Sequence, residues 1–277
     1  MTSIKALMQV VHDLQEIANQ AFPPYHELES MFQNSSTEKK SFTRAFSVGK
    51  VRIMAYTLKP DPFVPLLVLE WMGEIAKENT SDIRVFLAEV ATEKPPVLLM
   101  DFTSLKNWGE VTDNLVAGFI GALASKKVFS LLFQPRPGFE EKLEERKLTA
   151  HIISSLDSKE LLRPFQEKVV FQIFPKGRED FKGLPAIAQR MVNYGYFKVL
   201  VNLEGKALRG DDMEGLLEIY KAIKEKGGFC FLLGVTEEMK TVFKIMELEE
   251  LKTIVRQSAE EALQEMGEEL ILMDISI

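Results

Sequence analysis

The sequence predicts an α/β protein made of two similar domains that follow an amphipathic N-terminal helix. The chain has 277 residues, which is enough for about two domains. Short apolar runs alternate with amphipathic segments from about residue 60 onward, an alternation typical of helices packed on sheets. The second half also repeats the order of strands and helices of the first. Apolar residues make up 46% of the chain, so each half can bury a core.

The N-terminal segment has the pattern of one amphipathic helix followed by a linker. Apolar side chains recur at three- and four-residue intervals until Pro23 and Pro24 end the pattern. The stripe consists of Ile4, Leu7, Met8, Val11, Leu14, Ile17, Ala18 and Ala21. We expect this face to pack on the protein or to join two copies. Residues 27–40 lose the periodicity, so residues 1–40 are expected to form a helix and a linker.

The first domain is expected at residues 41–166. A β-hairpin is predicted around Gly49, because a strand-like run lies on each side of it. The segment 62–78 has a helical pattern, and 82–93 fits a helix or a strand. Beyond these, apolar runs typical of buried strands alternate with helical patterns. Strands are predicted at 95–102, 127–133 and 150–156, and helices at 110–126, 138–148 and 158–165.

The second domain is expected at residues 167–277. Its strands are predicted at 168–175, 197–205, 229–235 and 251–257, and its helices at 180–195, 211–228, 237–248 and 258–267. Ser258 and Glu261 have the spacing of a capping box at the start of the last helix. The tail Leu270–Ile277 has a strand-like pattern without a counterpart after the first domain. We expect it to supply a sheet-edge strand to its own domain, to the other domain or to a second subunit.

The two halves can be aligned on each other without a gap over a strand, a loop and a helix. At an offset of 101 residues, Leu99 aligns with Leu200 and Asp101 aligns with Asn202. The same offset aligns Gly109 with Gly210, Glu110 with Asp211, and Leu131–Leu132 with Leu232–Leu233. One residue then drops out, and Leu148 aligns with Leu248. This periodicity indicates a tandem duplication with divergence. Asp101 and Asn202 end their strands and are expected to hydrogen-bond a turn.

Composition and motifs exclude several classes of function. The net charge of −7 argues against a general electrostatic affinity for nucleic acid or an anionic membrane. The single cysteine, Cys230, excludes a disulfide within the chain, and the three histidines lack ligand spacing. No phosphate-binding glycine loop, nucleophile elbow or zinc-binding helix motif occurs. We therefore expect a non-enzymatic cytoplasmic protein with no cofactor, no bound metal and no membrane span.

The segment from Phe197 to Met266 resembles a STAS domain. The matching features are the strand VLVNLEG, a loop that leads into the helix GLLEIYKAIKEKGG, the strand FCFLLGV, the helix EEMKTVFKIMEL and the capped helix SAEEALQEM. The resemblance covers roughly the last 110 residues and, through the repeat, residues 41–165 more weakly. It implies a small mixed sheet with helices mainly on one face. It also implies a bacterial regulatory role similar to that of anti-sigma-factor antagonists.

The loop that carries the phosphate acceptor in those antagonists departs from the family pattern here. The family has a serine or threonine at the start of the following helix. In this sequence the corresponding residues are Arg209-Gly210-Asp211-Asp212 in the second domain and Trp108-Gly109-Glu110-Val111 in the first. Neither stretch has a hydroxyl at the acceptor position. The acidic residues can stabilise the start of the helix by capping free backbone N–H groups and interacting with the helix dipole. Alternatively, their charge imitates a permanently phosphorylated loop.

The function that the resemblance implies is binding of a protein partner such as an anti-sigma factor or a related kinase. We expect the binding surface to lie at Gly210, Asp211, Asp212 and Met213, with Gly109 and Glu110 as the counterpart in the first domain. The alternative is a self-associating scaffold or small-ligand sensor built from the duplicated domains. In either case, the N-terminal helix would favour a homo-oligomer, most simply a dimer.

Overall fold

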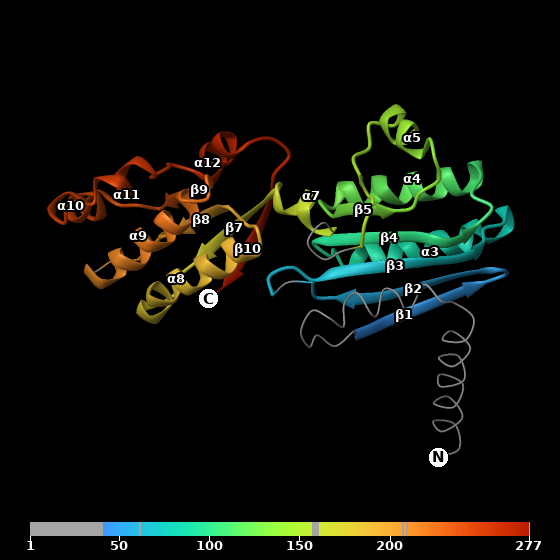
Figure 1. The fold of residues 1–277 in the computed structure, drawn as a ribbon, viewed down its shortest axis with the longest axis horizontal. Helices are drawn as coiled ribbons and strands as arrows, with labels where there is room; N and C mark the ends of the chain where they lie inside the picture. The colour runs from blue at the N-terminus through green and yellow to red at the C-terminus, as the bar shows by residue number, and fades with distance from the viewer. Residues whose placement is uncertain (1–40, 61, 157–160, 207, 209, 277) are drawn as a thin grey trace, which may run out of the picture. The chain divides into compact units, whose positions relative to one another are not determined.

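The computed structural model describes residues 41–277 except residues 61, 157–160, 207, 209 and 277 (Figure 1). The predicted N-terminal helix and linker at 1–40 lie outside the described residues. The chain divides into two compact units, with the boundary between Leu162 and Arg163. Within the described ranges, no helix is long and apolar enough to cross a membrane.

The first unit is built on a mixed six-stranded sheet with the order β1-β2-β3-β4-β5-β6. Strands β1 to β3 pair antiparallel, and β3 to β6 pair parallel. Its elements are β1 (Ser41–Val48), β2 (Val51–Leu58), β3 (Leu66–Glu74), a short 3-10 helix η1 (Lys77–Asn79), α3 (Thr80–Thr92), β4 (Val97–Lys106), α4 (Glu110–Ser125), β5 (Phe129–Phe133), α5 (Phe139–Glu145) and β6 (His151–Ile153). The hairpin predicted around Gly49 is therefore present.

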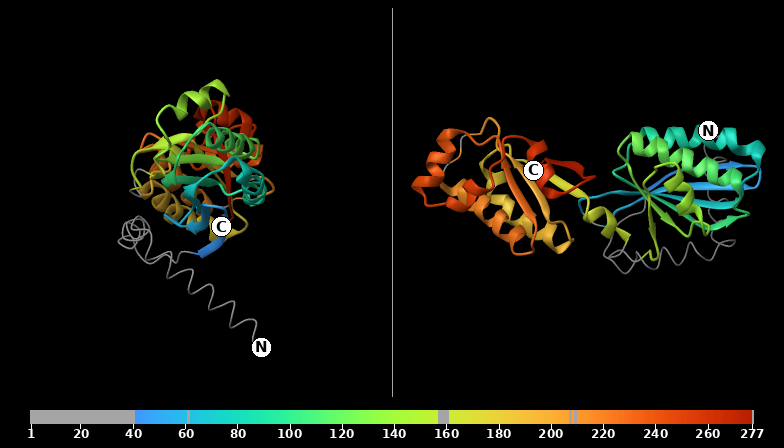
Figure 2. Two further views of the ribbon diagram at one scale, coloured as in Figure 1. Left: turned by 90° about the vertical axis from the view of Figure 1, so that its right-hand side faces the viewer. Right: turned by 90° about the horizontal axis from the view of Figure 1, so that it is seen from above.

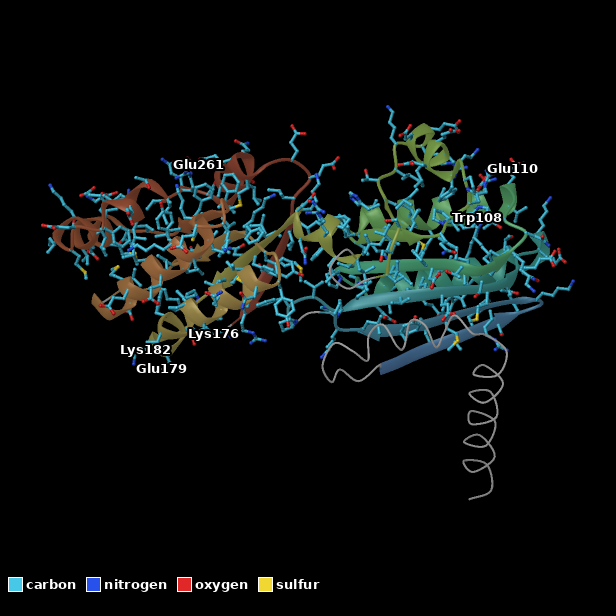
Figure 3. The ribbon with its side chains drawn as sticks, in the orientation of Figure 1. Trp108, Glu110, Lys176, Glu179, Lys182 and Glu261 are labelled. Carbon is cyan, nitrogen blue, oxygen red and sulfur yellow. The ribbon has the colours of Figure 1, made fainter. Side chains whose placement is uncertain are left out.

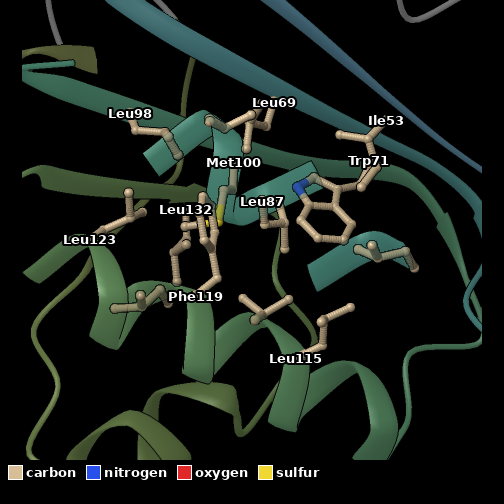
Figure 4. Packing of buried hydrophobic residues seen from close by; sticks show 14 of the residues in the cluster. Ile53, Leu69, Trp71, Leu87, Leu98, Met100, Leu115, Phe119, Leu123 and Leu132 are labelled. Atoms are coloured by element: carbon tan, nitrogen blue, oxygen red, sulfur yellow. The ribbon is translucent and has the colours of Figure 1, made fainter. Parts of the chain in front are cut away.

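The core of the first unit lies between one face of this sheet and helices α3 and α4. Figure 4 shows Trp71 of β3 and Met100 of β4 packed toward Leu115 and Phe119 of α4. Both Trp71 and Met100 have 0% exposure. The opposite face of the sheet is buried as well, since Val68 also has 0% exposure. Strands covered on both faces have nearly continuous apolar sequences, which explains the short apolar runs.

The predicted helix at 62–78 is wrong, because the structure places strand β3 there. Its first seven residues, Leu66–Met72, are all buried, and all of them except Glu70 are apolar. A short run that is apolar at nearly every position fits a helical spacing and a strand spacing equally well. The ambiguous segment at 82–93 is resolved as helix α3.

The second unit contains a parallel four-stranded sheet with the order β10-β7-β8-β9. Its elements are α7 (Arg163–Gln166), β7 (Val169–Phe174), α8 (Arg178–Asn193), β8 (Lys198–Asn202), α9 (Gly210–Lys224), β9 (Phe229–Leu233), α10 (Glu237–Ile245), α11 (Glu249–Thr253), α12 (Ala259–Met266) and β10 (Ile271–Ser276). Helices α8 and α9 lie side by side (Figure 2). Ser258 caps α12 by accepting from the Glu261 N–H, as its sequence predicts.

Helices α8 and α9 approach each other closely at Gly215. A Cβ atom added at this residue would lie 2.2 Å from the carbonyl oxygen of Phe181. Only a glycine therefore fits at this point of the helix crossing.

Two predictions for the end of the chain are tested by the second unit. The tail forms β10, which pairs in parallel with β7, so the prediction of an edge strand is confirmed for its own unit. The predicted strand at 251–257 is wrong. This segment forms helix α11 and then a single β-bridge from Val255 to Leu232. Leu251 and Ile254 are both buried three residues apart, a spacing that suits a helical turn.

Several backbone turns of the first unit recur in the second about 100 residues later. Among the residues with positive φ, Lys94, Lys127, Gln134 and Lys147 in the first unit match Gly195, Gly227, Gly234 and Glu247 in the second. Lys94 and Gly195 follow the ends of α3 and α8, and Lys127 and Gly227 follow the ends of α4 and α9. The turn after α4 is closed by a hydrogen bond of 3.0 Å from the Val128 N–H to the Leu123 carbonyl. The turn after α9 is closed by a bond of the same length from the Gly228 N–H to the Ile223 carbonyl.

Candidate partner-binding site

Helix α4 begins in the first unit with an exposed glycine and an exposed glutamate. Gly109 is the N-cap residue and has an extended backbone with φ −124°, and Glu110 is the first helical residue. Figure 3 shows Trp108 and Glu110 at this end of α4. The acidic side chain lies in the first turn, where the helix dipole favours negative charge.

A buried carboxylate fixes the loop that precedes α4. The side chain of Asp113 is only 3% exposed, and its Oδ1 accepts hydrogen bonds from Trp108 Nε1 at 2.7 Å and from Arg136 Nε at 2.8 Å. Arg136 donates a second bond to Oδ2 through Nη2. The Trp108 ring also packs edge-on against Phe102 and Phe139, with centroids 4.4 and 5.2 Å away. The loop is therefore held at several points.

These contacts keep Asp113 ionised. Burial alone would raise the pKa of its carboxyl, but the hydrogen bonds from Arg136 and Trp108 and the charge of Arg136 lower the pKa below its ordinary value. The same hydrogen bond raises the pKa of Arg136. The start of α4 thus has two acidic residues: Asp113, which is buried and paired with Arg136, and Glu110, which is exposed to solvent.

The start of α9 in the second unit offers less of the predicted surface. Gly210 is exposed, but Asp212 is 3% exposed and Met213 is 0% exposed. The side chain of Asp211 is outside the described part of the chain. Asp212 and Met213 are therefore not available to a partner in this conformation, which corrects two of the six predicted binding residues. Met213 belongs to the apolar stripe by which α9 packs on the sheet.

The buried positions of the two helices also correct the register of the sequence alignment. Thr112 and Asp113 in α4 and Asp212 and Met213 in α9 are all buried, at an offset of 100 rather than 101. Strands β5 and β9 keep this offset, because Phe129 pairs with Val97 and Phe229 pairs with Lys198. The second unit therefore has one residue fewer between Asn202 and Asp212 than the first unit has between Asp101 and Thr112. As a result, Gly109 and Gly210 are not at equivalent positions. The core residue Met213 takes the place of the ion-paired Asp113.

Asp101, inside β4, and Asn202, at the end of β8, each accept a hydrogen bond from the backbone two residues further on. Asp101 Oδ1 accepts from the backbone N–H of Thr103 at 2.9 Å, and Asn202 Oδ1 accepts from that of Glu204 at 3.0 Å. The prediction that these residues end their strands and hydrogen-bond a turn is confirmed for Asn202 but wrong for Asp101, because β4 continues through Thr103 to Lys106. Burial raises the pKa of Asp101, although the hydrogen bonds from Thr103 oppose this.

An exposed apolar pair at the end of α10 was missed by the sequence analysis. Ile245 is 74% exposed and Met246 is 39% exposed. A Cβ atom at Gly210 would lie 3.8 Å from Met246 Cε, so this pair adjoins the start of α9. A signal existed, because Ile245 lies away from the buried stripe of Met239 and Phe243 on α10. We name Ile245 and Met246 the α10 patch.

The cysteine, the threonines near α4 and the possible metal ligands are the remaining reactive groups. No group of three or more His, Cys, Asp or Glu side chains there could hold a metal ion. Burial raises the pKa of the Cys230 thiol to about 12, so this sulfur is protonated at neutral pH. Thr112 is 1% exposed, and the Thr103 hydroxyl donates to Asp101.

A search of protein-family models and a search of curated proteins give no match to this sequence. Solved structures of anti-sigma factor antagonists are similar to part of the chain. One from Mycobacterium paratuberculosis is 17% identical, with a TM-score of 0.32, over 40% of this chain and 93% of that chain. SpoIIAA in its unphosphorylated form is 13% identical, with a TM-score of 0.31, over 45% of this chain and 98% of its own. A third solved structure, of the protein TM1081, is 12% identical, with a TM-score of 0.32, over 46% of this chain and 99% of that chain.

Proposed function

We propose that this chain is a non-enzymatic regulatory protein that binds a protein partner, with a role similar to that of anti-sigma factor antagonists. The partner is an anti-sigma factor or a related kinase. The chain binds it through the exposed start of α4, and the start of α9 provides a second contact. The observation that carries this proposal is the fixed loop before α4. Trp108, Asp113 and Arg136 hold Gly109 and Glu110 on the surface.

A tandem duplication of a STAS-like domain is the origin we infer for this arrangement. Four positive-φ residues recur at an offset of 100 or 101, as do the buried positions of α4 and α9. Turns of this kind are specified by individual residues, so their joint recurrence supports common descent better than a shared apolar pattern does. The units differ at the sheet edge beside β3 and β7, where β2 pairs antiparallel and β10 pairs parallel.

Binding in this proposal does not depend on phosphorylation at the helix start. Neither Gly109 nor Glu110 has a hydroxyl group, and neither does Gly210. The exposed carboxylate of Glu110 supplies a constant negative charge, whereas a phosphate would supply a larger and removable one. Partner binding is then controlled by the amount of protein or by a contact elsewhere on the surface.

The test is affinity capture with the full chain from the lysate of its native organism. Glu110→Lys reverses the exposed charge, and Glu141→Lys is a matched control on an exposed glutamate in the first turn of α5. We expect one protein that the native chain and Glu141→Lys retain and that Glu110→Lys retains at least tenfold less. Equal retention by Glu110→Lys would contradict the proposed surface, and identification of a metabolic complex would contradict the proposed role.

A self-associating scaffold is the second candidate, and the edge strand β10 favours it. Leu272 on this strand is 41% exposed, and β10 contains neither proline nor lysine, the residues that usually block an open edge. This candidate predicts a dimer whose mass depends on Leu272. Light scattering of the native chain and of Leu272→Lys separates it from the first candidate, because a partner-binding monomer keeps one mass in both.

A further inference from the structure

The α10 patch is an unusual surface for this unit. Ile245 is the most exposed large hydrophobic side chain in the part of the chain that the structure describes, and Met246 follows it directly. Single exposed apolar residues are common on protein surfaces, whereas contiguous exposed apolar surface more often marks an interaction site. Methionine in particular adapts its shape to a partner.

The first unit shows that the fold does not require apolar residues at this place. Helices α5 and α10 end alike, because Leu143 and Phe243 are both buried and Lys147 and Glu247 both have positive φ. At the positions of Ile245 and Met246 the first unit has Glu145 and Arg146. Arg146 there donates a hydrogen bond to Asn114 of α4. The apolar pair is therefore specific to the second unit and is not part of its core.

The surroundings of the α10 patch are mainly acidic. Glu247, Glu249 and Glu250 follow it in the turn and in α11, and all three are exposed. Glu214 is exposed one helical turn after Gly210, the residue that Met246 adjoins. Two nearby lysines are already paired within their helices, Lys240 with Glu237 and Lys252 with Glu249, each at 2.7 Å, and Lys244 adds an exposed positive charge directly before Ile245. A partner that complements this surface carries positive charge around an apolar side chain.

We propose that the α10 patch binds a basic amphipathic helix of the partner protein. This inference rests on the proposed function and specifies the partner's chemistry at the second unit. Leucine-like side chains of the helix cover Ile245 and Met246, and its lysines or arginines face Glu214, Glu247 and Glu250. The apolar contact supplies affinity, and the charges select the orientation and raise the association rate.

The experiment uses the full chain and a synthetic helical peptide with leucines at three- and four-residue spacing and lysines elsewhere. Binding is followed by fluorescence anisotropy of the labelled peptide. We expect saturable binding that weakens when salt rises from about 50 to about 500 mM, because exposed charge pairs are screened. The double variant Ile245→Ser/Met246→Ser should bind at least tenfold more weakly. Val85→Ser is the control, since Val85 is 59% exposed in the other unit.

A peptide of the same pattern with glutamate in place of lysine should not bind. Equal binding of the lysine peptide to the double variant, equal binding of the glutamate peptide, or no binding at all would overturn the inference. Dimerisation of the native chain that the double variant loses would also overturn it, by assigning the patch to a second copy. Ile245→Glu serves if the double variant unfolds. Capture that depends on Glu110 but not on Ile245 would leave the proposed function standing and exclude this patch.

Discussion

The guanidinium of Arg136 donates two hydrogen bonds to the carboxylate of Asp113, across 23 residues of sequence. Asp113 is buried at the start of α4, and Arg136 lies in the loop between β5 and α5. In the second unit the corresponding positions hold Met213 and Thr236. The ion pair thus occupies a helix position at which the second unit has a buried apolar side chain.

Removal of one partner of this ion pair should destabilise the first unit more than replacement of both. Arg136→Thr leaves the buried carboxylate without its cation, and we expect a loss of about 1–3 kcal/mol in the free energy of unfolding. The double variant Asp113→Met/Arg136→Thr copies the second unit and should recover most of it. Urea unfolding measures both. A double variant that is less stable than Arg136→Thr would contradict this reading.

Acid should weaken the same contact. The pKa of Asp113 is lowered in the folded protein, so its stabilisation is present above the ordinary value of 3.8 and is lost as the pH falls through the lowered pKa. The native chain should therefore lose stability in this acid range, and Asp113→Asn should lose less. Thermal melting from neutral pH to about pH 2 gives the comparison. Parallel curves for the two proteins would show that Asp113 does not contribute.

Asp101 should have the opposite pH dependence. Burial raises its pKa above 3.8, so the folded chain binds a proton more readily and gains stability as the pH falls through the raised pKa toward 3.8. Asp101→Asn keeps an oxygen that can accept from Thr103 and carries no charge. We expect this variant to be at least as stable as the native chain at neutral pH. A large loss of stability at neutral pH would show that the ionised form is required.

The helix crossing at Gly215 should not tolerate a side chain. Gly215→Ala places a Cβ against the carbonyl of Phe181, and we expect a cost of about 1–3 kcal/mol from the displaced helices. Gly183→Ala in α8 is the matched control, because its Cβ would meet no atom within 4 Å. That control should gain about 0.5–1 kcal/mol from its helix propensity. Equal effects of the two substitutions on thermal melting would contradict the close approach.

The turns after α4 and α9 permit a reciprocal exchange. Lys127 and Gly227 both have positive φ, which costs a lysine about 1 kcal/mol more than a glycine. Lys127→Gly should therefore stabilise the first unit and Gly227→Lys should destabilise the second by a similar amount. Denaturant midpoints of the two variants check both signs. If both substitutions shifted the midpoint in the same direction, backbone conformation would not be the cause.

The apolar runs of the sequence predicted most strands and helices, because buried strands differ strongly in composition from amphipathic helices. The prediction failed at β3, where Leu66–Met72 is buried on both faces and has no period that excludes a helix. It failed again at α11, a helix of five residues, which is too short for periodicity to identify. Both failures depend on tertiary burial, which a local pattern does not contain.

The candidate site was predicted less well than the fold. The sequence alignment matched Gly109 with Gly210, an offset of 101. The burial pattern of the helices instead aligns Thr112 with Asp212, an offset of 100. A shift of one residue changes which side chains face solvent, so Met213 was assigned to a surface and lies in the core. The contact between Asp113 and Arg136 joins helix α4 to the loop between β5 and α5, and no sequence motif connects these two segments. The α10 patch was detectable, since Ile245 interrupts the polar side of α10.

The position of β10 has a consequence for the order of folding. The edge of β3 pairs with β2 of the hairpin β1–β2, which is synthesised before β3. The edge of β7 pairs with β10, which is synthesised about 100 residues later. During synthesis the nascent second unit therefore presents an open parallel strand until residues 271–276 emerge. Chaperone contact during this interval, or a pause in translation before it, would act on the second unit and leave the first unaffected.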